Sequence, residues 1–287
     1  MSTNVIKGVS TCELKSWNAF FDFIRDEHSN SPALIYRGQT SSEWKVESTL
    51  DRLEQRFPTK PNYAGRVPES FDCPPASREI HLRAFREAVR GKRGSEPPEL
   101  TNDEWWALAQ HHRLATPMLD WTYSPFVALF FAFEEEKYIN SSGQWTEPEK
   151  RVVYALSASC ISEKNSSGSP APLVFSPKGE TSYRLINQAG LFVKMPEKTD
   201  LESYVCENFK TETTTTAKPP QSARAILQKI LIPNKDRINC LKFLNKMNIN
   251  RMSLFPDIDG AACYINTLWE LDFDTSLGYL PNSLENS

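Results

Sequence analysis

The strongest constraint on the fold is a short run of apolar and aromatic residues near the middle of the chain. Residues 126–133, FVALFFAF, contain no polar side chain. Ser124 and Pro125 before the run are typical of a helix start, with serine as the N-cap and proline in the first turn. The run is far shorter than the roughly 20 residues that a helix needs to cross a bilayer. We therefore expect a helix from residue 125 to about 138 that packs inside a protein core.

Helical patterns dominate the first half of the chain and strand patterns the second. Capping boxes predict two helices: Ser10 with Glu13 before a helix that contains Trp17, and Thr101 with Glu104 before a helix that reaches the histidines. Two more helices are expected over residues 76–90 and from about 235 onward. Strands are expected over residues 33–36, 151–158, 183–194 and 223–233. This distribution favours an α+β fold with a helical N-terminal half.

Composition limits the classes of function. The formal net charge of -3 gives no overall attraction to nucleic acid or to a membrane, so such binding would need a local patch. The beginning of the sequence has no apolar secretory segment, and we expect a cytoplasmic protein without membrane contact. The 6 cysteines contain no C-x-x-C pair, which argues against a zinc site and a disulfide framework. We expect a single domain over residues 1–276 and a polar tail over 277–287.

Polar residues crowd the connection before the apolar helix. Asp120, Trp121, Thr122 and Ser124 stand at a helix N-terminus, where free backbone N–H groups can bind an anion or a ribose hydroxyl. The same residue types are common helix caps, so the segment alone is equally consistent with a structural role.

A second segment, YRGQ, lies at the end of the first expected strand. Arg37 offers a planar guanidinium that suits phosphate or carboxylate, and Gly38 would allow a ligand to approach the backbone. Alone, this motif is weak.

Four segments in order resemble the FRG-domain family, which is named for a Phe/Tyr-Arg-Gly motif. The segments are YRGQTSSEWKVESTLDR, LAQHHRLATPMLDWTYSPFVALFFAF, RLINQAGLFV and RMSLFPDIDG, and they span roughly residues 35–265. Tyr36 fills the first position of the family motif, and His112 and Arg113 stand where the family often has His-Tyr-Gly.

The order of these motifs is similar to that of the ADP-ribosyltransferases. The resemblance implies a split or mixed β-sheet core and NAD as a substrate, with no metal. Arg37 would hold the NAD phosphate or the nicotinamide ribose. The expected NAD-binding residues are Tyr36, Arg37, Gly38, Gln39, Asp120, Trp121, Thr122, Tyr123 and Ser124.

Cleavage of the nicotinamide–ribose bond develops positive charge on the ribose, so the site needs a nearby carboxylate. The segment similar to the third motif offers Gln188 and no glutamate. Candidates for the missing acid are Glu180, Glu207, Asp257 and Asp259. Asp257 and Asp259 could also bind Mg²⁺, but a turn is the favoured interpretation of the Pro-Asp-x-Asp-Gly segment.

The catalytic candidates are Arg37, Gln188 and His112. His111 and His112 are neighbours on a helix and point about 100° apart, so at most one of them faces a cleft. A purely structural histidine is the alternative.

One local patch could bind nucleic acid. Arg83, Arg86, Arg90 and Arg93 follow each other at helical spacing and would form one cationic face. Trp44, Trp105 and Trp121 could stack on bases if they are exposed. A solvated surface face is the alternative, because Glu79 and Glu87 dilute the charge.

We therefore expect an NAD-dependent ADP-ribosyltransferase that modifies RNA, DNA or a protein, with RNA slightly favoured. The resemblance alone implies a toxin or defence effector with an antitoxin as a further partner. The alternative is a non-catalytic module in which the same cleft binds a nucleotide or a partner. A metal-dependent nuclease would need clustered acids, which the sequence barely provides.

Overall fold

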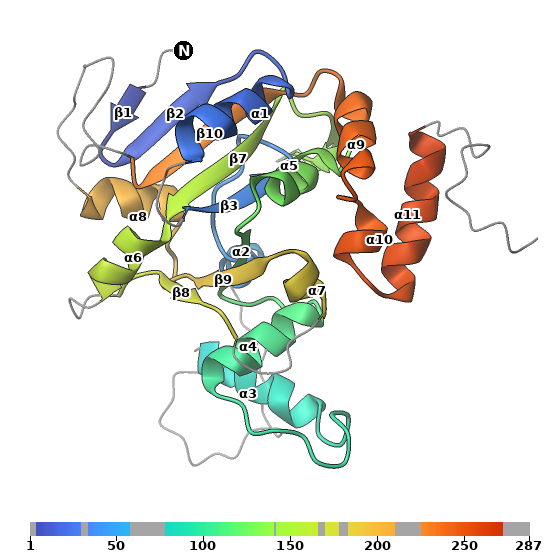
Figure 1. Ribbon diagram of the computed structural model, residues 1–287. Coiled ribbons are helices and arrows are strands. Elements are labelled where there is room, and N and C mark those ends of the chain that lie inside the picture. Colours follow the sequence, from blue (N-terminus) through green and yellow to red (C-terminus); the bar gives the residue numbers. More distant parts are fainter. Residues whose placement is uncertain are drawn as a thin grey trace, which may run out of the picture.

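The computed structural model describes residues 4–29, 34–57, 78–140, 142–165, 170–177, 183–209 and 225–271. Its centre is a mixed sheet of 8 strands in the order β1-β2-β10-β7-β3-β4-β9-β8, with helices on both faces (Figure 1). The strands are β1 (Asn4–Ile6), β2 (Val9–Glu13), β3 (Leu34–Gln39), β4 (Met118–Thr122), β7 (Lys150–Ser157), β8 (Leu173–Phe175), β9 (Gly190–Lys194) and β10 (Leu227–Pro233). A separate small hairpin consists of β5 (Tyr138–Ile139) and β6 (Trp145–Thr146). The α+β class with a mixed sheet is confirmed.

Helices occur along the whole described chain. They are α1 (Ala19–Phe23), the π-helix η1 (Ile24–His28), α2 (Thr49–Arg56), α3 (Arg78–Ala88), α4 (Asn102–His111), α5 (Pro125–Phe133), α6 (Ala158–Asn165), α7 (Tyr183–Asn187), α8 (Leu201–Asn208), α9 (Arg237–Lys246), α10 (Arg251–Leu254) and α11 (Ile258–Glu270). None of these described helices has both the length and the apolar character of a membrane span. The division of the chain into helical and strand halves is less sharp than expected, because β1 to β4 also join the central sheet.

The apolar helix α5 begins as its sequence predicts and ends earlier. Ser124 Oγ accepts a hydrogen bond from Val127 N at 3.3 Å, and Pro125 occupies the first turn. Two buried arginines satisfy the carbonyl groups at the C-terminal end of the helix. Arg151 Nη1 donates to Ala132 O at 2.6 Å, and Arg237 Nε donates to Phe133 O at 2.7 Å. These bonds replace further helical hydrogen bonds, which explains why α5 stops at Phe133.

Each face of the sheet has its own apolar core. On one face, Phe20, Phe130, Phe133 and Leu241 from α1, α5 and α9 are buried against the sheet. The other face is covered by α6 and α8, and its core includes the fully buried Tyr154 of β7. A third, smaller cluster joins α2, α3 and α4 to β4 and β9.

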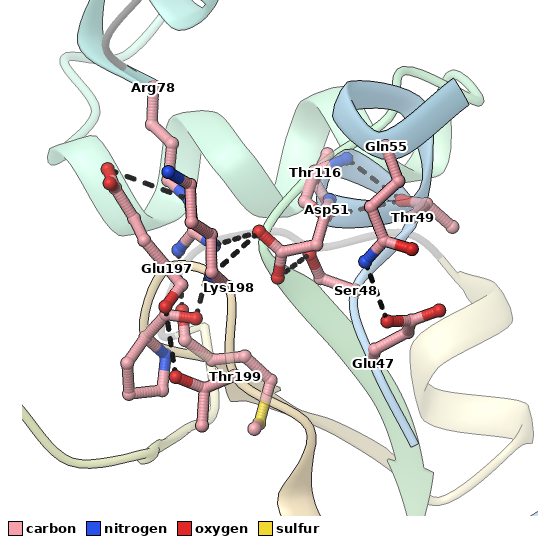
Figure 2. A network of polar contacts seen from close by, with 12 residues as sticks. Glu47, Ser48, Thr49, Asp51, Gln55, Arg78, Thr116, Glu197, Lys198 and Thr199 are labelled. Atoms are coloured by element: carbon pink, nitrogen blue, oxygen red, sulfur yellow. Dashed lines mark hydrogen bonds and ion pairs between the residues drawn. The ribbon is translucent and has the colours of Figure 1, made fainter. Parts of the chain in front are cut away.

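A buried polar network fastens the helices of this third cluster (Figure 2). Asp51 of α2 accepts a hydrogen bond from Ser48 Oγ at 2.8 Å and pairs with Arg78 Nη2 of α3 at 2.8 Å. Arg78 Nη1 also donates to Met195 O, just beyond β9, at 2.6 Å. Because Asp51 is buried, Arg78 is largely buried and both are hydrogen-bonded, the network fixes α3 relative to α2 and the sheet.

Two local predictions were wrong. Ser10 and Glu13 do not cap a helix but lie in β2, where residues 9–13 pair in parallel with β10. The sheet satisfies the backbone polar groups of this stretch, and that pairing outweighs the local capping pattern. Residues 183–194 form α7 and then β9, with a turn at Ala189, whose φ is 44°. Tyr123 N donates to Ala189 O at 2.9 Å and holds this turn against the end of β4.

Other predictions agree with the structure. The expected strands at 33–36, 151–158 and 223–233 correspond to β3, β7 and β10. Thr101 and Glu104 form the predicted capping box at the start of α4. The expected polar tail over 277–287 lies outside the described residues.

Candidate functional site

The central sheet is open between β3 and β4. These strands pair only at Tyr36 and Thr122, whereas β3 pairs with β7 from Leu34 through Gln39. Beyond that single pair, residues 37–39 and residues 120–121 face each other across the opening. Arg37 Nη1 reaches across it and donates to the backbone oxygen of Asp120 at 2.7 Å.

A cavity of about 1260 Å³ lies at this opening. It exceeds the roughly 300–1,000 Å³ of a typical small-molecule site, so a dinucleotide could fit. Its wall includes β3, β4, α4, α5, α7 and the segment from α10 into α11. The predicted NAD-binding and catalytic residues that line it are Tyr36, Arg37, Gly38, Gln39, Asp120, Trp121, Thr122 and Gln188. Arg93 and Trp44, which were candidates for nucleic-acid binding, line it as well.

Two other residues of the predicted set lie beside the cavity and do not line it. Tyr123 follows β4 and is 54% exposed. Ser124 caps α5 through its side chain. The segment from Asp120 to Ser124 therefore contributes its strand residues to the cavity, and Ser124 at the helix start has a structural role.

Gly38 lines the cavity, but the close approach of a bound ligand is not the reason why this position requires glycine. A Cβ atom there would lie 1.9 Å from Ala128 O and 2.6 Å from Ala132 N, both in the backbone of α5. The glycine is needed because α5 packs directly against β3. The sequence-based explanation of Gly38 is thereby replaced by a packing explanation.

Two arginines give one side of the cavity a positive charge. Burial lowers the pKa of the Arg37 guanidinium, and the nearby positive charge of Arg52 lowers it further, while Asp120 opposes both effects. Arg52 is exposed on α2 and lines the same cavity. Among the described residues, its side chain makes no hydrogen bond or ion pair. Two like charges at one wall favour an anionic ligand between them.

Buried polar atoms without partners border the opening. They are Arg37 Nε, Gln39 Oε1 and Trp121 Nε1, and none has a hydrogen-bond partner in the described part of the chain. Trp121 is only 2% exposed and Gln39 5%. Because a buried unpaired polar group costs about 1–3 kcal/mol, three of them at one opening indicate a site built for another molecule.

Of the two neighbouring histidines, only His111 lines the cavity. His112 lies at the C-terminal end of α4, is exposed and does not line the cavity, so the histidine at the cavity is His111 and not the predicted His112. Burial lowers the pKa of His111, with further lowering by His112 and Arg184. The imidazole therefore favours its neutral form, in which it can accept a proton.

Gln188 lines the cavity and is held in place by hydrogen bonds. Its side-chain Nε2 donates to Leu254 O at 3.1 Å, and its backbone oxygen accepts a bond from Thr122 Oγ1 at 2.6 Å. Gln188 thus connects β4 with the end of α10. Its position just after α7, and not within a strand, differs from the predicted third motif.

The candidate acids differ in position. Asp259 lines the cavity, whereas Asp257 caps α11 by accepting from Gly260 N at 2.8 Å and pairs with Arg184. Glu207 is exposed on α8 and does not line the cavity, and Glu180 lies outside the described residues. Asp120 is the carboxylate on the strand that borders the opening, and its Oδ2 accepts from Gln110 Nε2 at 3.0 Å. No group of three or more potential metal ligands occurs within the described ranges.

The predicted nucleic-acid face is largely engaged in internal contacts. Arg86 and Arg93 both lie over the Trp105 ring, with their guanidinium carbons 5.1 and 4.5 Å from the ring centroid. Arg86 also binds Asn102 Oδ1 at 2.7 Å, and Arg90 pairs with Glu87 at 3.1 Å. Arg83 has an interaction as well. These contacts fasten α3 to α4 and leave little free charge on that face.

The cavity residues that the sequence analysis missed include Phe255, Arg184 and Arg251. Phe255 lines the cavity, and the guanidinium groups of Arg184 and Arg251 lie 5.3 and 4.5 Å from its ring. Both arginines stand at the start of segments that carry the family resemblance, RLINQ and RMSLF. Their place in these segments was the one sequence feature that could have identified the two arginines. The strand and helix patterns did not show that the two segments meet at the cavity.

Comparison with known proteins gave one family match. The chain matches the FRG domain over residues 32–141, which include both Tyr36–Gln39 and Asp120–Thr122. No curated protein and no solved structure matches it. The segments that contain Gln188 and Phe255 lie beyond the matched residues. The similarity to the FRG-domain family is therefore carried by residues 32–141.

Proposed function

We propose that this protein is an ADP-ribosyltransferase that binds NAD as a substrate in the cavity at the sheet opening. The observation that carries the proposal is the convergence of Tyr36–Gln39 and Asp120–Thr122 at one opening that contains buried, unpaired polar atoms. The motif order that resembles ADP-ribosyltransferases supports the choice of NAD. When bound, NAD supplies a ribose carbon that exchanges its bond to nicotinamide for a bond to an acceptor.

The residues at the opening fit the polar groups of such a ligand. Arg37 and Arg52 supply positive charge for a diphosphate, and Arg37 is already oriented by its bond to Asp120 O. Trp121 Nε1 is a donor and Gln39 Oε1 an acceptor, which matches a carboxamide that needs both. The bulk of α5, α7 and Phe255 would exclude water from the ligand.

Asp120 is the carboxylate that we propose acts near the ribose. Gln110 positions its side chain, and its strand lies directly beside Arg37. A carboxylate there would stabilise positive charge that develops on the ribose. His111 would accept the proton that the acceptor loses, and Gln188 would orient the acceptor.

The acceptor that we propose is a nucleic acid, with RNA first, or a protein. The engaged arginines of α3 weaken the case for docking of nucleic acid on that face. The role as a toxin or defence effector with an antitoxin rests on the family resemblance.

The test is incubation of purified protein with NAD labelled in its adenylate part and with separate pools of RNA, DNA and cell protein. Transferred label and released nicotinamide are both measured. Arg37→Ala should lower the rate at least about 100-fold, the usual effect of removing a preorganised electrostatic group. Arg25→Ala is the matched control, because Arg25 is exposed, pairs with Asp22 and Asp26, and does not line the cavity. It should retain the wild-type rate.

Two variants and one binding measurement separate the alternatives. Asp120→Asn keeps the backbone oxygen that holds Arg37, so it should bind NAD normally and lose turnover. NAD that binds but stays intact in every pool would support the non-catalytic nucleotide-binding module instead. If calorimetry detects no NAD binding at all, both versions of the proposal are wrong.

A further inference from the structure

Helix α11 is apolar on two opposite sides. The inner side carries the buried Gly260, the half-buried Tyr264 and Leu268, and then the buried Leu271 that follows the helix. This side packs tightly, since a Cβ atom on Gly260 would lie 1.9 Å from Phe255 O. The inner side thus explains how α11 attaches to the rest of the molecule.

The opposite side is a second apolar stripe that faces solvent. It consists of Ile258, Ala262, Ile265 and Trp269, and we call it the outer stripe. Ile258 is 87% exposed, Ile265 47% and Trp269 86%, and Ala262 is exposed as well. The spacing i, i+4, i+7, i+11 places these side chains on one helical face, about half a turn from the inner side.

The outer stripe is unusual for the surface of a monomer. An isolated exposed isoleucine or tryptophan is ordinary, but four aligned apolar residues form a continuous seam of the kind that packs against another helix. No described residue buries this seam, although the opposite side of α11 is well packed.

We propose that the outer stripe binds the outer stripe of a second copy, with the two α11 helices antiparallel. The stripe is symmetric about its midpoint between Cys263 and Tyr264. An antiparallel pair therefore places Ile258 opposite Trp269 of the second copy, and the small Ala262 opposite the larger Ile265. Such self-complementarity is what a twofold interface requires.

The charges beside the outer stripe do not oppose this arrangement. The neighbouring acids are Asp257, Asp259 and Glu270. Each has an arginine in its own copy: Arg184 at 2.8 Å from Asp257, Arg113 at 3.9 Å from Asp259, and Arg237 in contact with Glu270. Pairing of two copies therefore does not bring uncompensated carboxylates together.

The size of the outer stripe sets the strength of the interaction. It offers roughly 500 Å² of surface per copy, or about 1,000 Å² in total, at the lower limit for a specific dimer. The dimer is therefore weak and reversible. Because Asp259, Gly260 and Cys263 of the same helix line the cavity, association would also steady one cavity wall. The inference is independent of any chemistry with NAD.

The test is sedimentation velocity of the full chain from about 1 to 200 µM, a range suited to an interface of this size. The wild type should shift from monomer to dimer as the concentration rises. Ile265→Asp should raise the dissociation constant at least tenfold. Asn266→Asp is the matched control, because Asn266 is exposed on the same helix beside the stripe and the change adds the same charge. It should leave the dissociation constant nearly unchanged.

A charge exchange tests the antiparallel register. Ile258→Lys and Trp269→Glu should each weaken the dimer, and the double variant should recover part of the association, since each lysine then faces a glutamate of the second copy. A parallel pair would place lysine against lysine and give no recovery. A wild type that stays monomeric throughout the range, or equal effects of Ile265→Asp and Asn266→Asp, would overturn the proposal.

Discussion

Gly38 is subject to two constraints at once. Its backbone lines the cavity, and its missing side chain lets the backbone of α5 approach β3. Arg37, the preceding residue, points to the opposite face of the sheet because side chains alternate along a strand. The motif Tyr-Arg-Gly thus combines a helix contact with a guanidinium at the sheet opening.

Gly38→Ala should destabilise the protein by about 3 kcal/mol or more, because the new methyl group meets backbone atoms that cannot rotate away. Urea unfolding followed by circular dichroism measures the loss. Gly190→Ala is the control, since the nearest atom there is the flexible end of Leu185 at 2.8 Å. Equal losses in both variants would show that α5 does not constrain Gly38.

At the scale of elements, α2 and α3 depend on one buried ion pair. Asp51 and Arg78 satisfy each other and also bind Ser48, Met195 O and Lys198 N (Figure 2). Arg52, one residue beyond Asp51, lies on the same helix and lines the cavity. By fixing α2, the network therefore also positions Arg52 at the cavity.

Arg78→Ala should lower the free energy of unfolding by about 3–5 kcal/mol, because it leaves the Asp51 carboxylate buried without its partner. The exposed pair of Arg90 and Glu87 provides the comparison, and Arg90→Ala should cost less than about 1 kcal/mol. Chemical denaturation of both variants measures the two losses in the free energy of unfolding. A loss in Arg78→Ala no larger than in Arg90→Ala would contradict a structural role for the pair.

At the scale of the whole molecule, a second ionic cluster joins the core to the cavity wall. Glu134 at the end of α5 pairs with Arg251, which lines the cavity, while Arg237 of α9 contacts both Glu134 O and Glu270 at the end of α11. Burial raises the pKa of Glu134 to about 7, although Arg251 and Arg237 act in the opposite direction.

This raised pKa predicts a loss of stability as pH increases. Below about pH 4.5, Glu134 is protonated in both states. Between there and about pH 7, only the folded state keeps the proton, so the free energy of unfolding falls, by roughly 3 kcal/mol in total. His81 and His111, whose pKa values are lowered, act in the opposite sense up to about pH 6.5.

The contribution of Glu134 is isolated by comparison with Glu134→Gln. Unfolding free energies of both proteins are measured from pH 5 to pH 8, and the difference between them should change by about 2–3 kcal/mol. A constant difference over this range would mean that Glu134 does not titrate there.

The sequence by itself determined the features that depend on neighbouring residues. The start of α5 at Ser124 and Pro125, the capping box of α4, and the strands β3, β7 and β10 follow from caps and apolar patterns that act over a few residues. The two segments that border the cavity were also marked by their residue types, since an arginine beside a glycine and polar groups at a helix start are local features.

The tertiary structure decided what depends on distant partners. Pairing with β10 makes Ser10 part of a strand, and pairing with β4 selects the strand β9 within residues 183–194. Only the assembled sheet shows that β3 and β4 separate after Tyr36, that His111 and not His112 lines the cavity, and that internal contacts engage the arginines of α3. Local patterns fix which conformations a segment prefers, whereas burial and backbone pairing between distant segments select among them, because an unpaired polar group in the interior costs more than a local preference gains.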